Sequence, residues 1–148
     1  MRDPDCVLCK IAADELPARF LYADETVVSF LDIAPATPGH SLVVPRAHRR
    51  DLWEIDDDEL AAVSLTARKV AAALRDVLAA PGMWLHQVSG AAAGQDVFHY
   101  HVHVIPRYEG DTVRPGWGEP PWRPPELSDT DLDAIAARVS EALAGSGR

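Results

Sequence analysis

The sequence predicts an α+β domain: an antiparallel sheet of about five strands with one long helix, a short N-terminal helix and a C-terminal helix. The 148 residues are enough for one hydrophobic core and too few for two full-sized ones. Apolar residues recur with the period of a strand in several short runs and with the period of a helix in one long segment. Strands and helices do not alternate regularly, which disfavours a parallel sheet.

The expected elements follow in chain order. The N-terminal helix begins around the Cys6-x-x-Cys9 stretch and runs to about Ala13. Runs rich in β-branched, aromatic and other apolar residues, bounded by turn residues, predict the strands. These runs cover residues 20–22, 26–31, 41–45, 83–88 and 97–106.

A helix of about six turns is expected between the third and fourth strands. Four consecutive acids, residues 56–59, suit the positive end of its dipole, and Pro81-Gly82 ends it. Side chains three or four residues apart form its apolar stripe: Leu60, Val63, Ala67, Val70, Leu74 and Val77. Residues 109–125, with five prolines and three glycines, are expected to be irregular, and Ser128 with Asp131 opens the last helix.

The charge balance excludes several classes of partner. The chain has 14 Lys and Arg against 23 Asp and Glu, a formal net charge of -9, so its surface as a whole repels phosphate backbones and anionic lipids. No stretch approaches the ~20 apolar residues of a membrane span, and no apolar leader follows the acidic first residues. We expect a soluble, cytoplasmic protein that binds neither nucleic acid nor membrane.

Cys6 and Cys9 have the spacing of a redox pair or of half a metal site. A thioredoxin-like pair should follow a strand and open a helix, but here an acidic, proline-containing segment precedes the cysteines. The sequence therefore favours zinc, with two reduced, half-buried thiols as the alternative.

Three histidines stand at alternate positions, 99, 101 and 103, in the most strand-like run of the chain. Alternate residues of a strand share one face, so the three imidazoles are expected on one side of the sheet. A solvent-facing polar stripe is the simpler alternative. A metal-dependent hydrolase with all three on one ion is disfavoured, because the outer Cα atoms of a straight strand would be ~13 Å apart while Zn–N bonds are only ~2.1 Å.

The loop of residues 89–96 precedes the histidines and is bounded by glycines, with almost no bulky side chains. Backbone N–H groups at Gly94, Gln95 and Asp96 are expected to approach an anion closely, as in a phosphate-binding nest. Glycine-rich loops are common, so this interpretation depends on the neighbouring histidines.

The stretch from Gly94 to Ile105, GQDVFHYHVHVI, resembles the signature of the histidine triad (HIT) family of nucleotide hydrolases and transferases. Matching stretches lie upstream at residues 6–11, 30–35 and 38–48, so the resemblance covers about residues 4–108. It implies that residues 1–108 form a HIT-like nucleotide-binding domain. Residues 109–148, the Pro-rich stretch and the C-terminal helix, are expected to belong to the same single domain.

The resemblance implies cleavage at the α-phosphate of a dinucleoside polyphosphate or a nucleoside phosphoramidate, with an adenine or other purine base. His101 would attack the phosphorus and form a covalent nucleotidyl-histidine intermediate. His103 would donate to the α-phosphate oxygens, and His40 would complete the polar cluster. Positioning and hydrogen bonding dominate this chemistry, so no catalytic metal is required.

The rest of the nucleotide site is also implied by the resemblance. Asp32 would accept hydrogen bonds from the ribose hydroxyls. Four apolar side chains would form the slot for the base, although plain core packing explains them equally well. They are Leu8, Ile11, Leu16 and Ile33.

Some bacterial members similar to this chain hold a structural zinc on two cysteines and two histidines. The ligands here would be Cys6, Cys9, His48 and His99, a closed tetrahedron without an open position. Family members also pair their sheets and long helices across a two-fold axis, which implies a homodimer. Few charged residues lie in the strand runs 83–88 and 97–105, so an exposed edge there also favours pairing.

Two residues depart from the family's pattern. Val88 stands where Asn or Gln is frequent, and Asp96 where many members have Ser or Thr. Both changes leave the leaving-group preference open. They favour the alternative function, a nucleotide-binding regulatory module with little or no turnover. His86 is interpreted as a satisfied or surface histidine.

Overall fold

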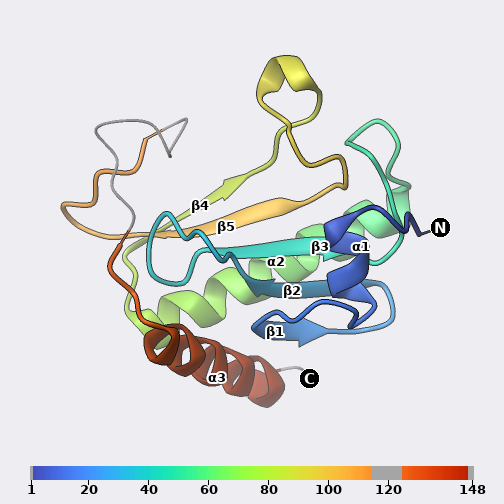
Figure 1. Ribbon diagram of the computed structural model, residues 1–148. Helices are drawn as coiled ribbons and strands as arrows, with labels where there is room; N and C mark the ends of the chain where they lie inside the picture. Colours follow the sequence, from blue (N-terminus) through green and yellow to red (C-terminus); the bar gives the residue numbers. More distant parts are fainter. Residues whose placement is uncertain (1, 115–124, 147–148) are drawn as a thin grey trace.

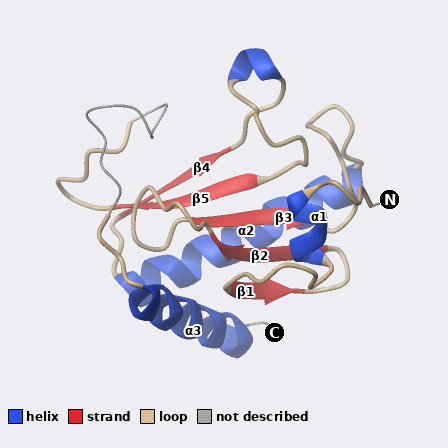
Figure 2. Ribbon diagram, in the orientation of Figure 1, coloured by secondary structure: helices blue, strands red, loops and turns tan. Residues whose placement is uncertain are grey.

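The computed structural model describes residues 2–114 and 125–146, in which a five-stranded antiparallel sheet carries three α-helices (Figures 1 and 2). The α+β fold class is confirmed. The strands are β1 (Phe20–Ala23), β2 (Val27–Leu31), β3 (Ser41–Pro45), β4 (Gly82–His86) and β5 (Val102–Arg107), in the spatial order β1-β2-β3-β5-β4. The helices are α1 (Val7–Ala12), α2 (Asp57–Leu78) and α3 (Asp129–Ser146).

Helix α2 begins where the acidic residues predict. Asp56 is its N-cap and forms a capping box with Glu59: the Asp56 side chain accepts from the Glu59 N–H, and the Glu59 side chain accepts from the Asp56 N–H. Four members of the predicted apolar stripe are buried against the sheet: Val63, Ala67, Val70 and Leu74. The helix ends at Ala79, which takes a left-handed conformation two residues before Pro81.

The two faces of the sheet are covered differently. Helices α2 and α3 pack on one face, and the short helix α1 packs on the other (Figure 1). The alternation along β2 shows the division, since Val27 and Leu31 join the core under α2 and α3 while Val28 and Phe30 pack under α1. Among the described residues, fewer apolar side chains cover the α1 side of the sheet, and the histidines lie on this side.

Strand β5 is shorter than the sequence predicts, because it begins at Val102 and not at residue 97. Continuing its register with β3 would bring Tyr100 opposite Pro45, which has no N–H to donate. The N–H of Tyr100 donates instead to the carbonyl of Arg49, at 2.6 Å. Residues 97–101 therefore precede the strand and lie outside the ladder. Strand β4 likewise ends at His86, two residues earlier than expected.

Helix α3 shares the core of α2. Ser128 caps it, donating its N–H to Asp131 while its hydroxyl accepts from the Asp131 N–H. Its apolar side chains Leu132, Ile135, Val139 and Leu143 are buried in the same cluster as the sheet residues under α2. Residues 115–124 of the expected irregular stretch lie outside the described part of the chain. Within the described part, every helix is too short or too polar to cross a bilayer.

Candidate functional site: a histidine cluster beside an apolar pocket

The three alternating histidines separate into two groups on the α1 side of the sheet. His101 and His103 lie together, with ring centroids 5.0 Å apart. His99 instead points to the cysteines of the N-terminal segment, within 3.5 Å of both sulfur atoms. Tyr100, Val102 and Val104, the residues between and after them, are buried in the opposite core. The alternation persists although the first two histidines precede the strand.

The backbone fixes the tautomer of His101. Its Nδ1 lies 2.7 Å from the carbonyl oxygen of His99. A carbonyl can only accept, so Nδ1 carries the proton. The Nε2 lone pair is then the atom that neutral His101 offers to a ligand, as a nucleophile requires.

A chain of hydrogen bonds fixes the tautomers of His40 and His103 as well. The backbone N–H of Ala36 donates to Nδ1 of His40 at 2.9 Å, so neutral His40 carries its proton on Nε2. Nε2 of His40 lies 2.9 Å from Nδ1 of His103 and therefore donates to it. The proton of His103 is consequently on Nε2, where it can be donated to a bound anion.

Gly39 allows His40 to enter this cluster. It has a φ of +93°, and a Cβ at this position would lie 2.6 Å from Cδ1 of Leu78. The backbone conformation therefore requires glycine, and a side chain here would also displace the end of Leu78. The turn brings His40 next to His103, although 63 residues separate them in the chain.

Burial keeps the imidazoles of His40 and His103 neutral. Desolvation, reinforced by the neighbouring histidines, lowers the pKa of His103 to about 3. Desolvation also lowers the pKa of His40, against the opposing charge of Asp32. These two side chains therefore act as uncharged donors and acceptors at neutral pH.

Asp32 lies between the histidines and the neighbouring pocket. Its Oδ1 accepts from the N–H of Ala34 at 2.8 Å, while its Oδ2 is 3.5 Å from Nε2 of His40 and 3.9 Å from Nδ1 of His103. The carboxylate is thus held by the backbone on one side and directed toward the cluster on the other.

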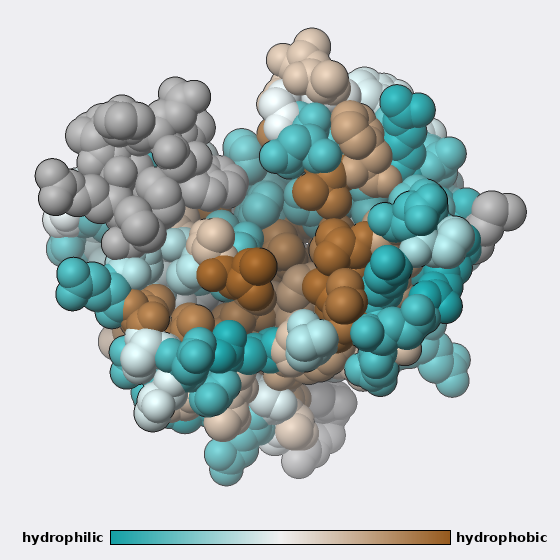
Figure 3. All heavy atoms as spheres, viewed as in Figure 1, coloured by the Kyte–Doolittle hydropathy of each residue, from teal (hydrophilic) through white to brown (hydrophobic). Residues whose placement is uncertain are grey.

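An apolar pocket of about 310 Å³ opens beside His101 and His103. Figure 3 shows apolar side chains gathered around a hollow in the middle of this face of the molecule. The predicted site residues Leu8, Ile11, Asp32, Ile33 and Asp96 line it together with the two histidines. The remaining lining residues, which the motifs did not indicate, are Val7, Pro17, Ala18, Phe30, Leu31, Leu42 and Val97. Leu16 is not part of the lining.

The loop before the histidines is closed by its own hydrogen bonds. Residues Ala91–Ala93 form a short 3₁₀ turn, and the N–H groups of Gly94 and Gln95 donate to the carbonyls of Ala91 and Gly90. The buried Gln95 side chain accepts from the Gly90 N–H and donates to the carbonyls of Arg50 and Val97. In this conformation Gly94 and Gln95 shape the loop and do not line the pocket, whereas Asp96 does.

Cys6, Cys9, His48 and His99 form a second cluster, with one ligand atom of each within 4.8 Å of the others. The Sγ–Nδ1 distances are 3.4 Å for Cys6–His99, 3.4 Å for Cys9–His48 and 3.5 Å for Cys9–His99. A tetrahedral zinc with bonds of ~2.3 Å to sulfur and ~2.05 Å to nitrogen separates S and N ligands by about 3.6 Å. The four residues therefore fit a zinc ion.

The surroundings of this cluster also suit a metal. Nε2 of His99 lies 2.8 Å from the carbonyl oxygen of Pro45, so its proton is on Nε2 and Nδ1 offers a lone pair to the cluster. The backbone N–H of Asp3 donates to Sγ of Cys9, and that of Cys9 donates to Sγ of Cys6, as thiolate ligands require. Burial lowers the pKa of His99 to about 4, which keeps it unprotonated for coordination.

Asp32, His40 and His103 also have ligand atoms within 4.8 Å of one another. Here the geometry fits hydrogen bonding better than a shared ion. The 2.9 Å separation of the two imidazole nitrogens is a hydrogen bond, whereas two nitrogens on one tetrahedral zinc lie ~3.4 Å apart. Nδ1 of His40 is already used by the Ala36 N–H.

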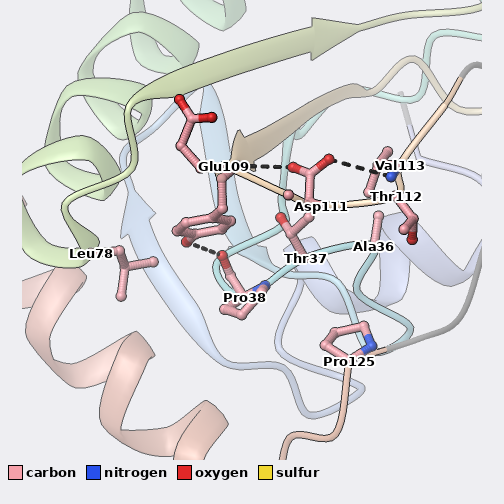
Figure 4. Close-up of a pocket in the computed structure, with 11 residues that line it drawn as sticks. Ala36, Thr37, Pro38, Leu78, Glu109, Asp111, Thr112, Val113 and Pro125 are labelled. Carbon is pink, nitrogen blue, oxygen red and sulfur yellow. Dashed lines mark hydrogen bonds between the residues drawn. The ribbon is translucent and has the colours of Figure 1, made fainter.

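A larger, more open cavity of about 510 Å³ lies between the end of α2 and the loop after β5 (Figure 4). Its walls include Leu78, Pro38 and Val113, and its acidic edge includes Asp111. That carboxylate is bound to Arg107 through both oxygens, at 2.6 and 2.9 Å. The cavity has no histidine and no cysteine in its lining, so the smaller pocket is the better candidate for chemistry.

His86 belongs to the histidine cluster, which the sequence interpretation missed. It lies directly opposite His103 in the β4–β5 pairing, with ring centroids 6.1 Å apart. It is half-buried and stands in a strand whose partner cannot be known from local sequence. Only the register of β4 against β5 identifies it.

Comparison with known proteins agrees with the motifs. Residues 13–110 match the HIT domain. The chain belongs to the HIT family. Protein hit of Bacillus subtilis is a relative 36% identical over 143 residues, which cover 96% of this chain and 97% of that protein. An uncharacterized HIT-like protein of Methanocaldococcus jannaschii is 39% identical over 134 residues, covering 90% of this chain and 98% of its own length.

Solved structures of HIT proteins share the architecture. A HIT-like protein from Bartonella henselae, crystallised with an unknown ligand, superimposes with a TM-score of 0.83 at 32% identity and covers 95% of this chain and 98% of its own. A Zn-bound histidine triad family protein from Mycobacterium smegmatis gives a TM-score of 0.82 at 33% identity, covering 97% and 96%. Membership of the HIT family supports nucleotide hydrolase or transferase chemistry in general.

Proposed function

We propose that this HIT protein cleaves at the α-phosphate of a dinucleoside polyphosphate or a nucleoside phosphoramidate, through a covalent nucleotidyl intermediate on His101. One observation carries the proposal: the His99 carbonyl holds the Nδ1 proton of His101, so the Nε2 lone pair is available at the pocket. Neutral imidazole in this tautomer is the form that attacks phosphorus.

The reaction proceeds in two displacements. Nε2 of His101 forms a bond to the α-phosphorus while the bond to the leaving oxygen or nitrogen breaks and its electron pair stays with that atom. Water then attacks the phosphorus, the N–P bond breaks, and its electron pair returns to Nε2. A leaving amine also takes one proton from solvent, and the attacking water returns one proton to solvent as it bonds to phosphorus.

His103 and His40 act as an oriented donor pair. The Nε2–H of His103 donates to the α-phosphate oxygens, and its direction is set by the chain that begins at the Ala36 N–H. Preorganised donors of this kind stabilise charge that develops in the transition state.

The nucleoside half occupies the apolar pocket. We assign the purine base to the part lined by Leu8, Ile11 and Ile33, and the ribose hydroxyls to Asp32. The phosphates then lie beside Asp96 and the two histidines. The apolar walls suit a neutral base, and the Asp32 carboxylate suits a hydroxylated sugar.

We also propose that Cys6, Cys9, His48 and His99 hold a structural zinc. Four protein ligands fill a tetrahedron, so the ion would supply folding free energy and no open coordination position. The cluster joins the start of α1 to the segment that carries the nucleophile.

A homodimer is the proposed assembly. Strand β4 is an edge of the sheet: β5 pairs with one side of it, and no strand of the described residues pairs with the other. Beside it, α2 exposes Leu65 to 50% together with several alanines, which permits close approach of a second copy. Sedimentation equilibrium at micromolar concentration is expected to give twice the 16.1 kDa chain mass. The chain mass itself, unchanged on tenfold concentration, would exclude the dimer.

The second candidate function is a nucleotide-binding regulatory module. It is favoured by Asp96, an exposed carboxylate in the pocket lining where it repels phosphate, and by Val88, which has no side-chain donor. Turnover of diadenosine tetraphosphate and of adenosine 5′-phosphoramidate on one preparation separates the two. The proposed enzyme releases AMP from at least one compound, and His101→Gly abolishes the release. If the protein binds AMP but cleaves neither compound, it is a nucleotide-binding regulatory module.

A further inference from the structure

His86 stands at the far end of a row of side chains that crosses three strands. In the sheet register Leu42 of β3 lies opposite His103 of β5, and His103 lies opposite His86 of β4. Directly opposite residues place their side chains on the same face, about 5 Å apart at Cβ. The row therefore runs from Leu42 through His103 to His86.

The pocket for the nucleoside lies at one end of this row. Leu42, His101 and His103 line it, whereas His86 does not. Consider a nucleotide with its base in the pocket and its α-phosphorus beside His101. The leaving group on that phosphorus then extends toward β4. His86 is the histidine on that side.

The position of His86 is defined by its neighbours. Its ring centroid is 6.1 Å from that of His103 and 5.4 Å from that of Trp84, both at tilted angles. Trp84 shares its face of β4, two residues earlier, and packs beside the buried Ile105. The imidazole is thus placed between the aromatic ring and the reacting centre.

The side chains around the expected phosphate position include two that cannot donate a hydrogen bond to phosphate oxygens. The Val88 side chain carries no hydrogen-bonding group, and the Asp96 carboxylate repels phosphate oxygens. Burial and the nearby His101 lower the pKa of His86, so at neutral pH it provides an N–H donor without a full charge. Such a donor would recognise phosphate oxygens through hydrogen bonding.

We propose that His86 is a specificity-determining residue that binds the phosphate oxygens beyond the α-phosphorus, which makes a nucleoside polyphosphate, rather than a phosphoramidate, the preferred substrate class. The proposal rests on the function proposed above. An ammonia leaving group ends at the atom bonded to phosphorus and does not extend to His86. A polyphosphate leaving group does.

The test compares two substrates that share their AMP half. His86→Ala is expected to lower kcat/KM for diadenosine tetraphosphate at least tenfold and to leave kcat/KM for adenosine 5′-phosphoramidate within twofold. His86→Asn, which keeps a donor on a shorter side chain, should recover part of the loss. Equal losses with both substrates would show that His86 acts only through His103, and no loss with either would show no role; both results overturn the proposal.

A binding measurement separates this proposal from the proposed function. Calorimetric titration of the His101→Gly protein should show tighter binding of ADP than of AMP, and adding His86→Ala should remove that difference. An unchanged difference overturns the role of His86 whether or not the protein is an enzyme. Wild-type protein that cleaves neither substrate refutes the catalytic proposal, and the claim for a preferred substrate fails with it.

Discussion

Replacing His40 tests whether the hydrogen-bond chain sets the direction of the His103 proton. In the wild type, Nε2–H of His40 donates to Nδ1 of His103 at 2.9 Å. His40→Leu removes that donor and leaves the Asp32 carboxylate nearby, with its Oδ2 3.9 Å from Nδ1 of His103. A carboxylate only accepts, so His103 should move its proton to Nδ1 and turn a lone pair toward the phosphate.

The size of the effect on kcat follows from the hydrogen bond that His103 would no longer donate to the α-phosphate. A bond to a charged group contributes about 1.5–3 kcal/mol, and each ~1.36 kcal/mol is a factor of ten in rate. The expected loss in kcat is therefore roughly 10- to 150-fold, with a smaller change in KM if the bond strengthens in the transition state.

Two variants and one spectrum make the result decisive. His40→Gln places an amide N–H near the position of the imidazole Nε2 and should retain most of the rate that His40→Leu loses. Nitrogen-detected NMR of His103 should report the Nε2–H tautomer in the wild type and the Nδ1–H tautomer in His40→Leu. A His40→Leu protein with wild-type kcat and an unchanged His103 tautomer would refute the reasoning.

Three further predictions concern the nucleophile, the metal cluster and an ion pair. His101→Gly should reduce turnover below a few per cent of wild type while nucleotide affinity stays within about tenfold, measured by steady-state kinetics and calorimetry. Cys6→Ser, or a chelator, should remove one zinc per chain and lower Tm by roughly 5–10 °C, the effect of a ligand at about 100 times its Kd; unchanged metal content and Tm would contradict the site. Arg107 lowers the pKa of Asp111 to about 2, below the ordinary 3.8, so the pair stabilises the fold above pH ~4 and this contribution, about 1–2 kcal/mol, is lost as pH falls toward 2. Asp111→Asn should remove that part of the acid dependence, as measured by urea unfolding at each pH.

Elements with local determinants were predictable from the sequence. Helix α2 begins at the Asp56–Glu59 capping box because the signals for a helix start are a few residues long and act within the same segment. The face that it buries follows from the spacing of its apolar residues. The fold class was therefore accessible before the structure, as was the alternation that places Tyr100 opposite the histidines.

Features that depend on distant pairing were not predictable in this way. The start of β5 was wrong by five residues, because the ladder ends where β3 offers Pro45, a partner fixed by tertiary structure. His86 was interpreted as a satisfied or surface histidine, and its place beside His103 was missed for the same reason, since that proximity depends on the register between β4 and β5. The backbone N–H of Gln95 was expected to face a phosphate; in this conformation it donates to the Gly90 carbonyl, and the buried side chain closes the loop through three backbone partners.

Sequence spacing alone predicted only two of the four residues in the metal cluster. Cys6 and Cys9 gave half of a site, and only the resemblance supplied His48 and His99, which are 39 and 90 residues away from Cys9 in the chain. The structure brings the four together with sulfur–nitrogen distances close to those of a zinc tetrahedron. The role of these residues in metal binding stays a prediction for metal analysis to test.

The two clusters are mechanically linked through a single residue. The side chain of His99 lies in the cysteine cluster, while its carbonyl accepts the Nδ1 proton of His101. Residues 97–101 have left the sheet ladder, so strand pairing does not hold that carbonyl in place. The peptide that carries it is held by the Tyr100 N–H, which donates to the Arg49 carbonyl, and by the side-chain contacts of His99 with the cysteine sulfurs at Nδ1 and with the Pro45 carbonyl at Nε2. A zinc ion in the cluster would therefore influence the nucleophile without touching the nucleotide, because it would add to the contacts that fix the carbonyl which determines which nitrogen of His101 is free to attack.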